Sequence, residues 1–513
     1  MSSTPIEGSV GLTRLLRDAS LSQLISTAFA LLLIRWVAKV IYRVYFHPLT
    51  RFPGPKLAAA TRIPQLYSIL IGSSHDRLCK LHQQYGDVVR VSPDEISFIG
   101  PQAWRDIHGH GSKGTPGSVP EKHWDRYGKS VNGGVSLINA QDADHTRMRR
   151  IFTSAFSDRA LKQQEPLFMK YVNQLVHNIK DGAQEDPNRK WDMVRLFNFT
   201  TFDIMGDLTF GEPLHMLSNA EYDPWVSLIF GSIKFGTRLS IMNFYPALRK
   251  IFKVFVPESF AKKRYEHFQF SVKRVTKRLE KGRDSEGVDL WDLVLGQEEG
   301  KGLTRDEMDS NSSLFMIAGT ETTATLLSGL TYILLRNPEC MKEVVKEVRE
   351  AFASGEDMHM ENLAALPYMN ACIKEAFRLY PPVAIGLPRL TPPNGSTICG
   401  EFVPPGTTVT VPHLAMYTSE RNFKDPYKYA PERWLGDEKY ENDHRAVLQP
   451  FSVGSRDCLG KNMAYHEMRL ILAKILYNFD FELCLESEGW IDHQETYNLW
   501  EKQPLMCRLK PVA

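Results

Sequence analysis

One of the seven cysteines in the chain has surroundings that strongly restrict its local structure. Residues 451–460 read FSVGSRDCLG, and the helical pattern KNMAYHEMRLILAKILYNF follows directly. Gly454 and Gly460 permit backbone turns that other residues resist. Such turns free amide N–H groups to point at the Cys458 sulfur, and the start of the helix adds positive dipole. Both effects lower the pKa of a thiol, so we expect a stabilised thiolate at Cys458.

The remaining cysteines are scattered, and the closest two, Cys484 and Cys507, are 23 positions apart. No C-x-x-C occurs, which excludes zinc ribbons, iron–sulfur ladders, c-type haem attachment and thioredoxin chemistry. An odd and scattered set fits a reducing compartment, where a lone cysteine packs as a small hydrophobic residue. That interpretation fails for Cys458, because a packing cysteine needs neither flanking glycines nor the nearby cation of Arg456.

Composition describes an ordinary globular chain. Its 513 residues are 43% hydrophobic and 24% charged, with a formal net charge of +2, which argues against a nucleic-acid coat. Length alone favours several domains, yet no repeat or long linker divides residues 57–513. Helical periodicity dominates 160–280, and the strand-like runs are few and short, so the fold class is mainly α with minor β. These runs are Val88–Val91, Ile96–Ile99, Thr397–Phe402 and Thr407–Val411.

The N-terminus carries an apolar run. LSQLISTAFALLLI, from Leu21 to Ile34, has no charge, and the apolar pattern continues to Phe46. The following basic residues are four apart, so on a helix they share one face and reach lipid head groups; they are Arg35, Lys39 and Arg43. A cleaved signal peptide is the alternative, but cleavage after Ala30 would leave LLLI behind. We therefore expect an uncleaved membrane anchor helix.

Basic residues on the two sides of this run predict its orientation. Residues 1–20 contain two, whereas residues 35–62 contain six and no acid, which places the bulk of the chain in the cytosol. Phe52–Pro55 forms a stiff turn that ends the helix. The expected organisation is a luminal tail and anchor at 1–46, a proline-rich hinge at 47–56 and a main domain at 57–513.

One long helix is predicted over residues 305–336. Thr304 and Glu307 form a capping box, and Asn337-Pro338 stops the pattern. The middle of this helix is hydrophobic nearly all round, so it should cross the core.

The centre of that helix reads AGTETT, from Ala318 to Thr323, a poor choice for helix stability. One interpretation is a tolerated polar patch satisfied by backbone hydrogen bonds. A buried carboxylate is costly without a partner or a task, however, so a functional role for Glu321 is favoured.

These motifs together resemble the cytochrome P450 family. The decapeptide 451–460 fits its haem-binding signature F-x-x-G-x-R-x-C-x-G at every position. Three further motifs follow the family order: A-G-x-E-T-T at 318–323, E-x-x-R at Glu375 and Arg378, and P-E-R-W at 431–434. The match covers about residues 50–510. It implies a single triangular, mostly helical domain that carries haem b, despite the length argument.

The resemblance also assigns roles to individual residues. Cys458 would be the axial iron ligand, with haem propionates held by Arg456 and Arg389. The family's W-x-x-x-R helix has His145 in place of the tryptophan and keeps Arg149, so both are expected beside the propionates. The other cofactor-lining positions would be Ala318, Gly319, Phe451, Gly454 and Gly460. A structural lock would consist of Glu375, Arg378 and Arg433.

The activity implied is monooxygenation. One atom of O2 enters an apolar small molecule and the other becomes water, with Glu321 and Thr322 as the acid–alcohol pair that delivers protons. The chain has no flavin or NADPH segment of its own, so electrons from NADPH would arrive through a separate membrane-bound reductase, with cytochrome b5 as a further donor. Nucleic acid is not an expected partner.

Two stretches, YRVYFHPLTRFPGPKL and VNGGVSLINAQDADHTRMRRIFTSAFSDRAL, are similar to filamentous-fungal enzymes of the trichothecene-hydroxylase-like group. That group implies a terpenoid, polyketide or alkaloid of secondary metabolism, including mycotoxins, and a single-pass endoplasmic reticulum protein with a cytosolic catalytic domain. Two alternatives are a haem-thiolate isomerase or dehydratase without external electrons, and a non-catalytic haem-binding protein. Neither needs the acid–alcohol pair, which is intact here.

Overall fold

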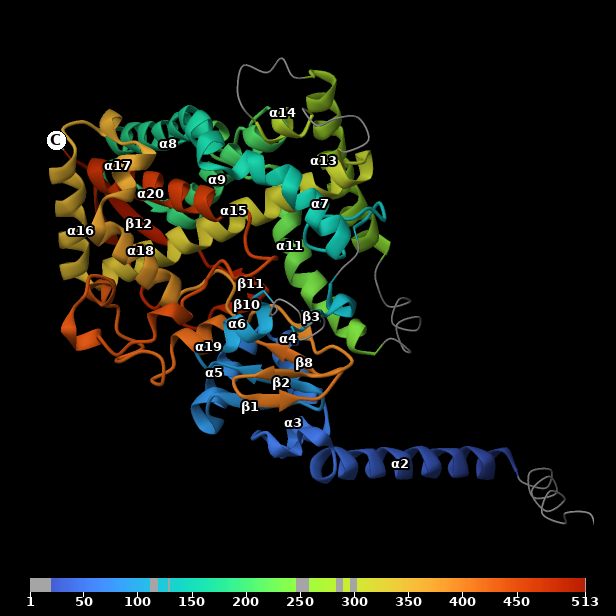
Figure 1. The fold of residues 1–513 in the computed structure, drawn as a ribbon. Coiled ribbons are helices and arrows are strands. Elements are labelled where there is room, and N and C mark those ends of the chain that lie inside the picture. Colours follow the sequence, from blue (N-terminus) through green and yellow to red (C-terminus); the bar gives the residue numbers. More distant parts are fainter. Residues whose placement is uncertain are drawn as a thin grey trace, which may run out of the picture.

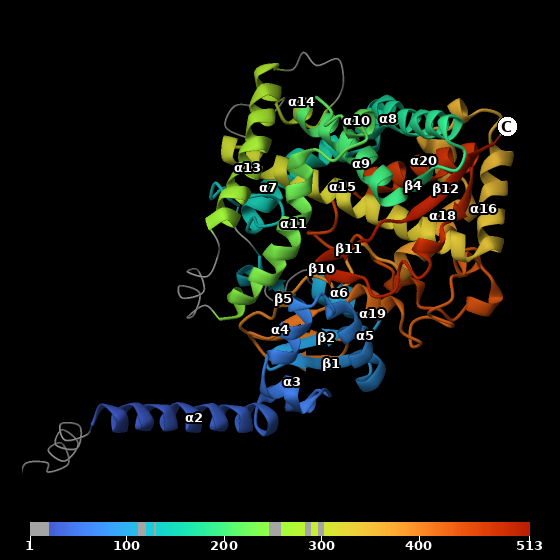
Figure 2. The ribbon, with the colours of Figure 1, turned by 180° about the vertical axis from the view of Figure 1, so that it is seen from behind.

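The computed structural model describes residues 20–110, 119–127, 130–245, 258–282, 289–295 and 302–512. Helices build most of the body and the strands are short, which confirms the mainly α class with minor β (Figure 1). Seen from both sides, the longer helices gather at one end of the body and the sheet that contains β1 and β2 lies at the other (Figure 2).

The bounds of the helices longer than ten residues are α2 Leu21–Tyr45, α5 Ser74–Tyr85, α7 Asp142–Thr153, α8 Asp158–Glu185, α9 Met193–Phe210, α11 Pro224–Leu239, α13 Glu258–Glu280, α15 Arg305–Arg336, α16 Pro338–Ala351, α18 Pro367–Leu379 and α20 Lys461–Asn478. The shorter ones are α3 Lys56–Ala60, α4 Ile63–Leu70, α6 Ala103–His108, α10 Met216–Asn219, α14 Leu290–Val294, α17 Met360–Ala364 and α19 His413–Tyr417.

The largest sheet has five strands in the order β1-β2-β8-β5-β3. Their bounds are β1 Val88–Ser92, β2 Glu95–Phe98, β8 Thr408–Thr410, β5 Arg389–Leu390 and β3 Glu121–Lys122. β2 and β8 run parallel, whereas the other neighbours are antiparallel. Lys122 lies directly opposite Arg389 in the β3–β5 pair, so this sheet edge brings two cations together.

One expected strand proves to be a hairpin. The run Thr397–Phe402 splits into β6 Ser396–Ile398 and β7 Glu401–Val403, which pair with each other. Cys399 and Gly400, both with positive φ, form the two-residue turn between them. These two short strands hydrogen-bond to each other. The other expected strand, β8, pairs with β2 and β5 in the main sheet.

The C-terminal region adds two small sheets that the sequence patterns do not reveal. β12 Met506–Pro511 lies between β4 Lys190–Asp192 and β9 Phe479–Leu483. β10 Glu495–Tyr497 and β11 Leu499–Glu501 form a separate hairpin. Residues 502–505 connect this hairpin to β12 and run close to the centre of the molecule, as described below.

The predicted long helix is confirmed at both ends. In α15 the Glu307 N–H donates to the Thr304 hydroxyl at 3.3 Å, and the Glu307 carboxylate accepts from the Thr304 N–H at 2.9 Å. The helix crosses the middle of the body, where it packs against α9, α13, α18 and α20. Most of its residues from 320 to 334 are buried, as its hydrophobic pattern predicts.

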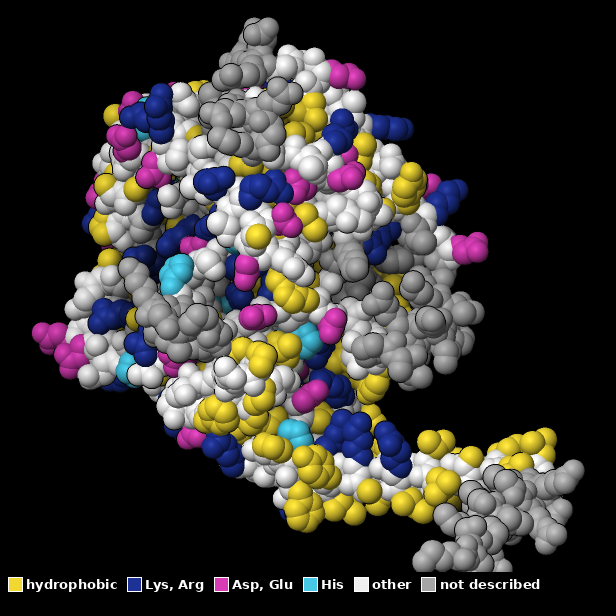
Figure 3. All heavy atoms as spheres, turned by 45° about the vertical axis from the view of Figure 1, so that its right-hand side comes forward, with side chains coloured by type: hydrophobic (Ala, Val, Ile, Leu, Met, Phe, Trp, Pro, Cys, Tyr) yellow, Lys and Arg dark blue, Asp and Glu magenta, His cyan; other side chains and the backbone are white. Residues whose placement is uncertain are grey.

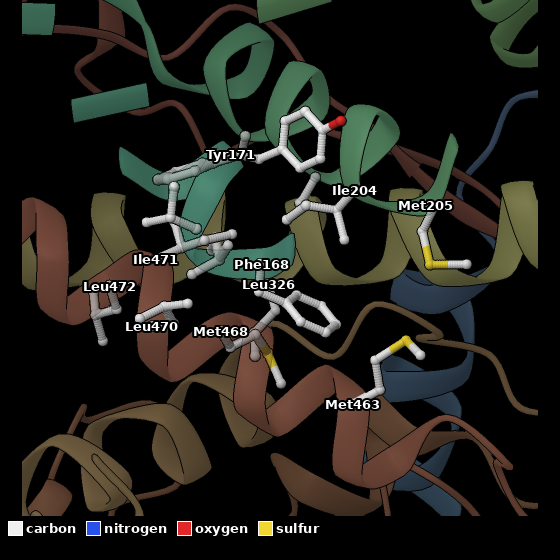
Figure 4. Close-up of a cluster of buried hydrophobic side chains, with 14 of the residues drawn as sticks. Phe168, Tyr171, Ile204, Met205, Leu326, Met463, Met468, Leu470, Ile471 and Leu472 are labelled. Carbon is white, nitrogen blue, oxygen red and sulfur yellow. The ribbon is translucent and has the colours of Figure 1, made fainter. Parts of the chain in front are cut away.

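The main core lies where α8, α9, α15 and α20 meet (Figure 4). Its buried members include Phe168, Ile204, Met205, Leu326, Met468 and Ile471. Each such side chain contributes roughly 1.5–3 kcal/mol when fully buried. This packing fixes α20 relative to α15, and so it fixes the loop that precedes α20 relative to the centre of α15.

α2 projects from the sheet end of the body, and none of its residues is buried (Figure 3). Its 25 residues span about 37 Å, and the helix is long and apolar enough to cross a membrane. The base of α2 is fastened to the body by two hydrogen bonds. Arg43 Nη1 donates to the Ala60 carbonyl at 3.0 Å, and Arg90 Nη1 donates to the Arg43 carbonyl at 2.9 Å.

Candidate active site

The loop before α20 presents the Cys458 side chain. The Cys458 N–H donates to the Phe451 carbonyl at 2.8 Å, which closes the loop on itself. The Phe451 ring packs against Phe377 and Tyr465, with ring centroids 5.3 and 5.2 Å apart. The side chain of Cys458 is nevertheless exposed. The loop is therefore held rigidly from behind while its sulfur stays open to a ligand.

The two glycines of the loop have different reasons to be there. Gly454 has φ +85°, and a Cβ at this position would lie 2.0 Å from the His108 carbonyl oxygen, so only glycine fits. Gly460 is the N-cap of α20 with an ordinary φ of −85°, and the nearest atom to an added Cβ, on Phe156, is 3.8 Å away. The prediction of a backbone turn that other residues resist is right for Gly454 and wrong for Gly460.

The predicted lowering of the Cys458 pKa is also wrong for the protein alone. Desolvation by the surrounding loop raises the pKa of this thiol even though the residue has an exposed side, and the opposing effects of the Gly460 N–H and of the Arg149 and Lys461 charges are smaller. The sequence argument counted the donors around the sulfur and left out the cost of desolvating a thiolate. A bound metal cation deprotonates a coordinating thiol outright, so Cys458 would ligate a haem iron as the thiolate.

Arg149 fastens α7 to the cysteine loop. Its Nη1 donates to the Asp457 carbonyl at 2.7 Å, and its Nη2 pairs with the Asp457 carboxylate. The family resemblance places this arginine at a propionate, whereas in the structure its guanidinium binds the residue before Cys458. Its position one turn beyond His145 keeps both side chains at the same end of the site.

A cluster of cations lies beside this loop, and its members come from three elements. Arg456 Nη2 donates to the Ala140 carbonyl at 2.9 Å and to Asp142 Oδ1 at 2.6 Å. Its Nη1 is buried and has no hydrogen-bond partner among the described residues. The cluster is completed by Lys122 of β3 and Arg389 of β5, and the buried His145 of α7 lies beside it.

Mutual repulsion shows how concentrated this positive charge is. Burial, together with Arg456 and Arg389, lowers the pKa of Lys122 to about 7. Burial, together with Arg456 and Arg149, lowers the pKa of His145 to about 4, so this imidazole is neutral. Lys122, which has no recognisable motif around it, is the member of the cluster that the sequence analysis missed. An anionic ligand with carboxylates would relieve the repulsion and bind the free Arg456 nitrogen.

The centre of α15 offers a second, apolar wall. Ala318 is exposed and Thr322 is half-buried, although Thr320, Glu321 and Thr323 around them are buried. Ala318 and Thr322 are four positions apart, so they share the face of α15 that the described side chains leave uncovered. A small side chain at Ala318 leaves room for a flat ligand.

Gly319 has another role from the one the resemblance implies. A Cβ there would lie 2.8 Å from Met205 Sδ on α9, so the glycine allows α15 and α9 to pack closely. The structure gives Gly319 a role in helix packing, and its place at the cofactor stays a prediction.

The polar residues of this segment are satisfied in two ways. The hydroxyls of Thr320 and Thr322 donate to the Met316 and Ala318 carbonyls at 2.6 and 2.8 Å, as the backbone-bonding alternative proposed. Glu321 differs, because its Oε1 pairs with Lys502 while its Oε2 is buried and has no hydrogen-bond partner among the described residues. The sequence analysis did not find Lys502.

The structural lock is a fully buried network. Arg378 donates to both oxygens of Glu375, at 2.7 and 3.0 Å, and Arg433 Nε donates to Oε1 at 3.3 Å. The Trp434 indole and the Ala430 N–H add further donors at 2.9 and 3.1 Å. Glu375 thus joins α18 to the segment around Pro431–Trp434, as the lock requires.

The site therefore has the groups that haem needs. Cys458 supplies a sulfur donor, the cluster of Lys122, Arg389 and Arg456 supplies partners for two propionates, and the Ala318 face of α15 supplies a flat apolar wall. The unpartnered Arg456 nitrogen is the strongest single indication, because an orphaned buried guanidinium N–H is costly without an anion.

Comparison with known proteins gives a consistent answer. A family model described as cytochrome P450 matches residues 53–507. Cytochrome P450 monooxygenase efuB of Hormonema carpetanum is 45% identical over 507 residues, which cover 98% of this chain and 100% of the relative. Cytochrome P450 monooxygenase FUM2 of Gibberella moniliformis is 48% identical over 471 residues, covering 91% and 99%. AMT3 of Alternaria alternata, with the same description, is 42% identical over 480 residues, covering 93% and 97%.

The family model spans both walls of the site, from the main sheet to β12, and the relatives align over nearly their whole length. Membership implies a haem-thiolate cofactor, which agrees with the donor set above. The chain belongs to the cytochrome P450 family and is a cytochrome P450 monooxygenase.

Proposed function

We propose that this monooxygenase inserts one oxygen atom from O2 into an apolar small molecule of fungal secondary metabolism, a terpenoid, polyketide or alkaloid. The observation that carries the proposal is that the described side chains leave both Cys458 and the Ala318 and Thr322 face of α15 uncovered. Likeness to the trichothecene-hydroxylase-like group and to monooxygenases from fungi supports the substrate class.

The residues around the site divide the work. Haem bound through Cys458 would supply the activation of O2 and the transfer of oxygen. Arg456, Arg389 and Lys122 would bind its carboxylates, and the neutral His145 would donate a hydrogen bond beside them. The Phe451 ring, packed on Phe377 and Tyr465, holds the backbone of the cysteine loop in place.

Protons reach the site along α15. The Thr322 hydroxyl lies on the uncovered face, where it donates to the Ala318 carbonyl at 2.8 Å and would be available to donate a proton into the site. Glu321 receives a proton at its free Oε2 and passes it on. General acid catalysis of this kind contributes roughly 10²–10⁴-fold.

The α2 helix is the proposed endoplasmic reticulum anchor, with the tail 1–20 luminal and the catalytic domain 57–513 cytosolic. In that position the domain meets a membrane-bound NADPH-dependent reductase and cytochrome b5. Removal of residues 1–46 should release the protein from microsomes at least in part, measured by sedimentation. Protection of the domain from protease in sealed microsomes would contradict the orientation.

The decisive test of the cofactor site is the carbon monoxide difference spectrum of the reduced protein. The wild type should give the thiolate-type Soret shift, Cys458→Ala should lose it, and Cys340→Ala, a half-buried cysteine in α16, should keep it. Retention of the shift in Cys458→Ala would refute the assignment. NADPH consumption with a reductase then tests the reaction, and turnover without NADPH would favour an isomerase or dehydratase.

A further inference from the structure

Lys502 reaches the centre of α15 from the far end of the chain. It follows β11 directly, and its ammonium group contacts Glu321 Oε1 and donates to Thr325 Oγ at 2.8 Å. Glu321 and Thr325 are one helical turn apart, so the lysine lies along α15 rather than across it. Only 3% of the Lys502 side chain and 5% of the Glu321 side chain are exposed, so the ion pair is almost completely removed from water.

The position of Lys502 is set by aromatic packing two residues before it. Trp500 stacks on Tyr380 with ring centroids 4.7 Å apart, and its indole N–H donates to the Pro381 carbonyl at 2.8 Å. Tyr380 in turn lies tightly against α15, because a Cβ at Gly329 would be 2.2 Å from its ring. The backbone that carries Lys502 is therefore fixed relative to the helix that carries Glu321.

Glu321 depends on this one cation among the described residues. Burial raises the pKa of its carboxyl group, and Lys502 is the neighbour that opposes the rise through its charge and its hydrogen bond. The other titratable groups that face this region favour the neutral acid or are themselves neutral at pH 7. They are Glu501 beside Lys502, the phenols of Tyr380 and Tyr222, and Glu467 of α20, which hydrogen-bonds to Thr323.

The two oxygens of Glu321 are thus unequal. Oε1 is held by Lys502, whereas Oε2 has no hydrogen-bond partner among the described residues. An ammonium group on one oxygen holds the carboxylate in a single direction and leaves the other oxygen to exchange a proton. The hydroxyl of Thr322, the next residue, donates a hydrogen bond to the Ala318 carbonyl.

We propose that Lys502 is a positioning residue for proton delivery, which holds the Glu321 carboxylate in its direction and charge and so sets the pH range over which α15 supplies protons. The inference rests on the proposed role of Glu321 in the monooxygenase reaction. Lys502 itself touches neither the cofactor-lining residues nor the cysteine loop in the contacts of the described residues.

The first test is the pH profile of coupling, measured as hydrogen peroxide released per NADPH consumed by the full-length holoenzyme with its reductase. A proton donor fails as the pH rises through its pKa, and loss of an adjacent cation raises the pKa of a carboxyl group. In Lys502→Met the alkaline rise in peroxide should therefore move upward by at least about one pH unit. Lys502→Arg, which keeps the charge, should stay close to the wild type. An unmoved profile in Lys502→Met would overturn the control of proton delivery by Lys502, and the second test then shows whether the failure lies at Lys502 or at Glu321.

The second test does not depend on turnover. A buried carboxyl group with a raised pKa stabilises the folded state fully below its unfolded pKa, and this stability is lost as the pH rises through the folded value. The melting temperature of Lys502→Met should therefore fall below that of the wild type by an amount that grows from pH 5 to pH 8. The difference in melting temperature from the wild type should not grow with pH in Lys502→Met/Glu321→Gln, because this variant has neither charge.

Lys190→Met is the matched control, because it breaks a lysine–glutamate pair with Glu486 that is more than 40% exposed on both sides and should change little. If Lys502→Met is not recovered as folded protein while Lys502→Met/Glu321→Gln is, the result shows directly that the buried Glu321 charge needs Lys502. A gap that does not grow with pH would overturn the assignment of Lys502. A growing gap together with an unmoved peroxide profile would instead reject Glu321 as the proton donor, so the two failures are distinguishable.

Discussion

Glu375 and Glu321 are both buried carboxylates on helices, yet their surroundings are opposite. Glu375 accepts hydrogen bonds from two arginines, an indole and a backbone N–H, so both of its oxygens are occupied. Glu321 has Lys502 on one oxygen, and the other oxygen is unpartnered among the described residues. A carboxylate with every acceptor site filled is fixed in place and in charge, whereas one with a free buried oxygen can exchange a proton.

The same contrast separates the two walls of the site. The cysteine loop is held by bonds that would be costly to break, from Arg149 to Asp457 and from Cys458 to the Phe451 carbonyl. The centre of α15 has hydroxyls that return to their own helix and a single ion pair. Rigidity thus lies on the side of Cys458, the proposed iron ligand, and exchangeable groups lie on the side proposed to deliver protons.

Removal of Glu375 should have the largest effect on folding. Glu375→Ala leaves Arg378 buried without its carboxylate and takes one of two carboxylates from Arg433, which keeps Asp443; breaking a buried pair destabilises a protein by about 3–5 kcal/mol. Thermal unfolding and the yield of haem-containing protein measure the loss. Glu321→Gln, which is nearly isosteric and keeps hydrogen-bonding capacity, should cost far less. Similar stability losses in the two variants would break the comparison.

The two glycines of the cysteine loop give a matched pair with a smaller effect. Gly454→Ala places a Cβ against the His108 carbonyl at a positive φ, which should cost at least about 2 kcal/mol and weaken haem retention. Gly460→Ala has room and an ordinary backbone, so its melting temperature should match the wild type. Equal effects at the two positions would show that the loop is less constrained than its contacts indicate.

Glu467 extends the comparison to a carboxyl group without a cation. Burial raises its pKa to about 8, opposed mainly by the Thr323 hydroxyl. Its stabilising effect should be full below the ordinary value of 4.5 and fall as the pH rises through about 8. Glu467→Gln should therefore flatten the fall in melting temperature between pH 6 and about pH 9. An unchanged slope would place the titration elsewhere.

Local signals made part of this structure predictable. The capping box at Thr304 and the Asn337-Pro338 stop lie within a few residues of the helix ends they specify, so the bounds of α15 followed from the sequence. The loop proposed to hold the haem was picked out for the same reason, since its glycines and its arginine are adjacent to Cys458. The family motifs then located Glu375, Arg378 and Arg433, which the structure brings into contact.

Features that depend on distant contacts were not predictable from local patterns. Lys502 is 181 positions from Glu321, and no local pattern marks it. The pKa of Cys458 was expected to be lowered and is raised, because desolvation depends on the whole fold. Gly460 was expected to form a turn that other residues resist, but as the N-cap of α20 it has an ordinary φ. The strands around Thr397–Phe402 were short enough to pair locally, which hydrophobic alternation does not reveal.

The most direct test of the account is the peroxide yield of the α15 variants. Hydrogen peroxide released per NADPH consumed is measured for the wild type, Thr322→Ala, Glu321→Gln and the double variant, with a substrate that shifts the Soret band. Haem content and substrate binding should be unchanged, while the peroxide ratio rises strongly in each variant and most in the double one, because proton delivery fails. A ratio equal to that of the wild type in the double variant would contradict the claim that the centre of α15 supplies protons.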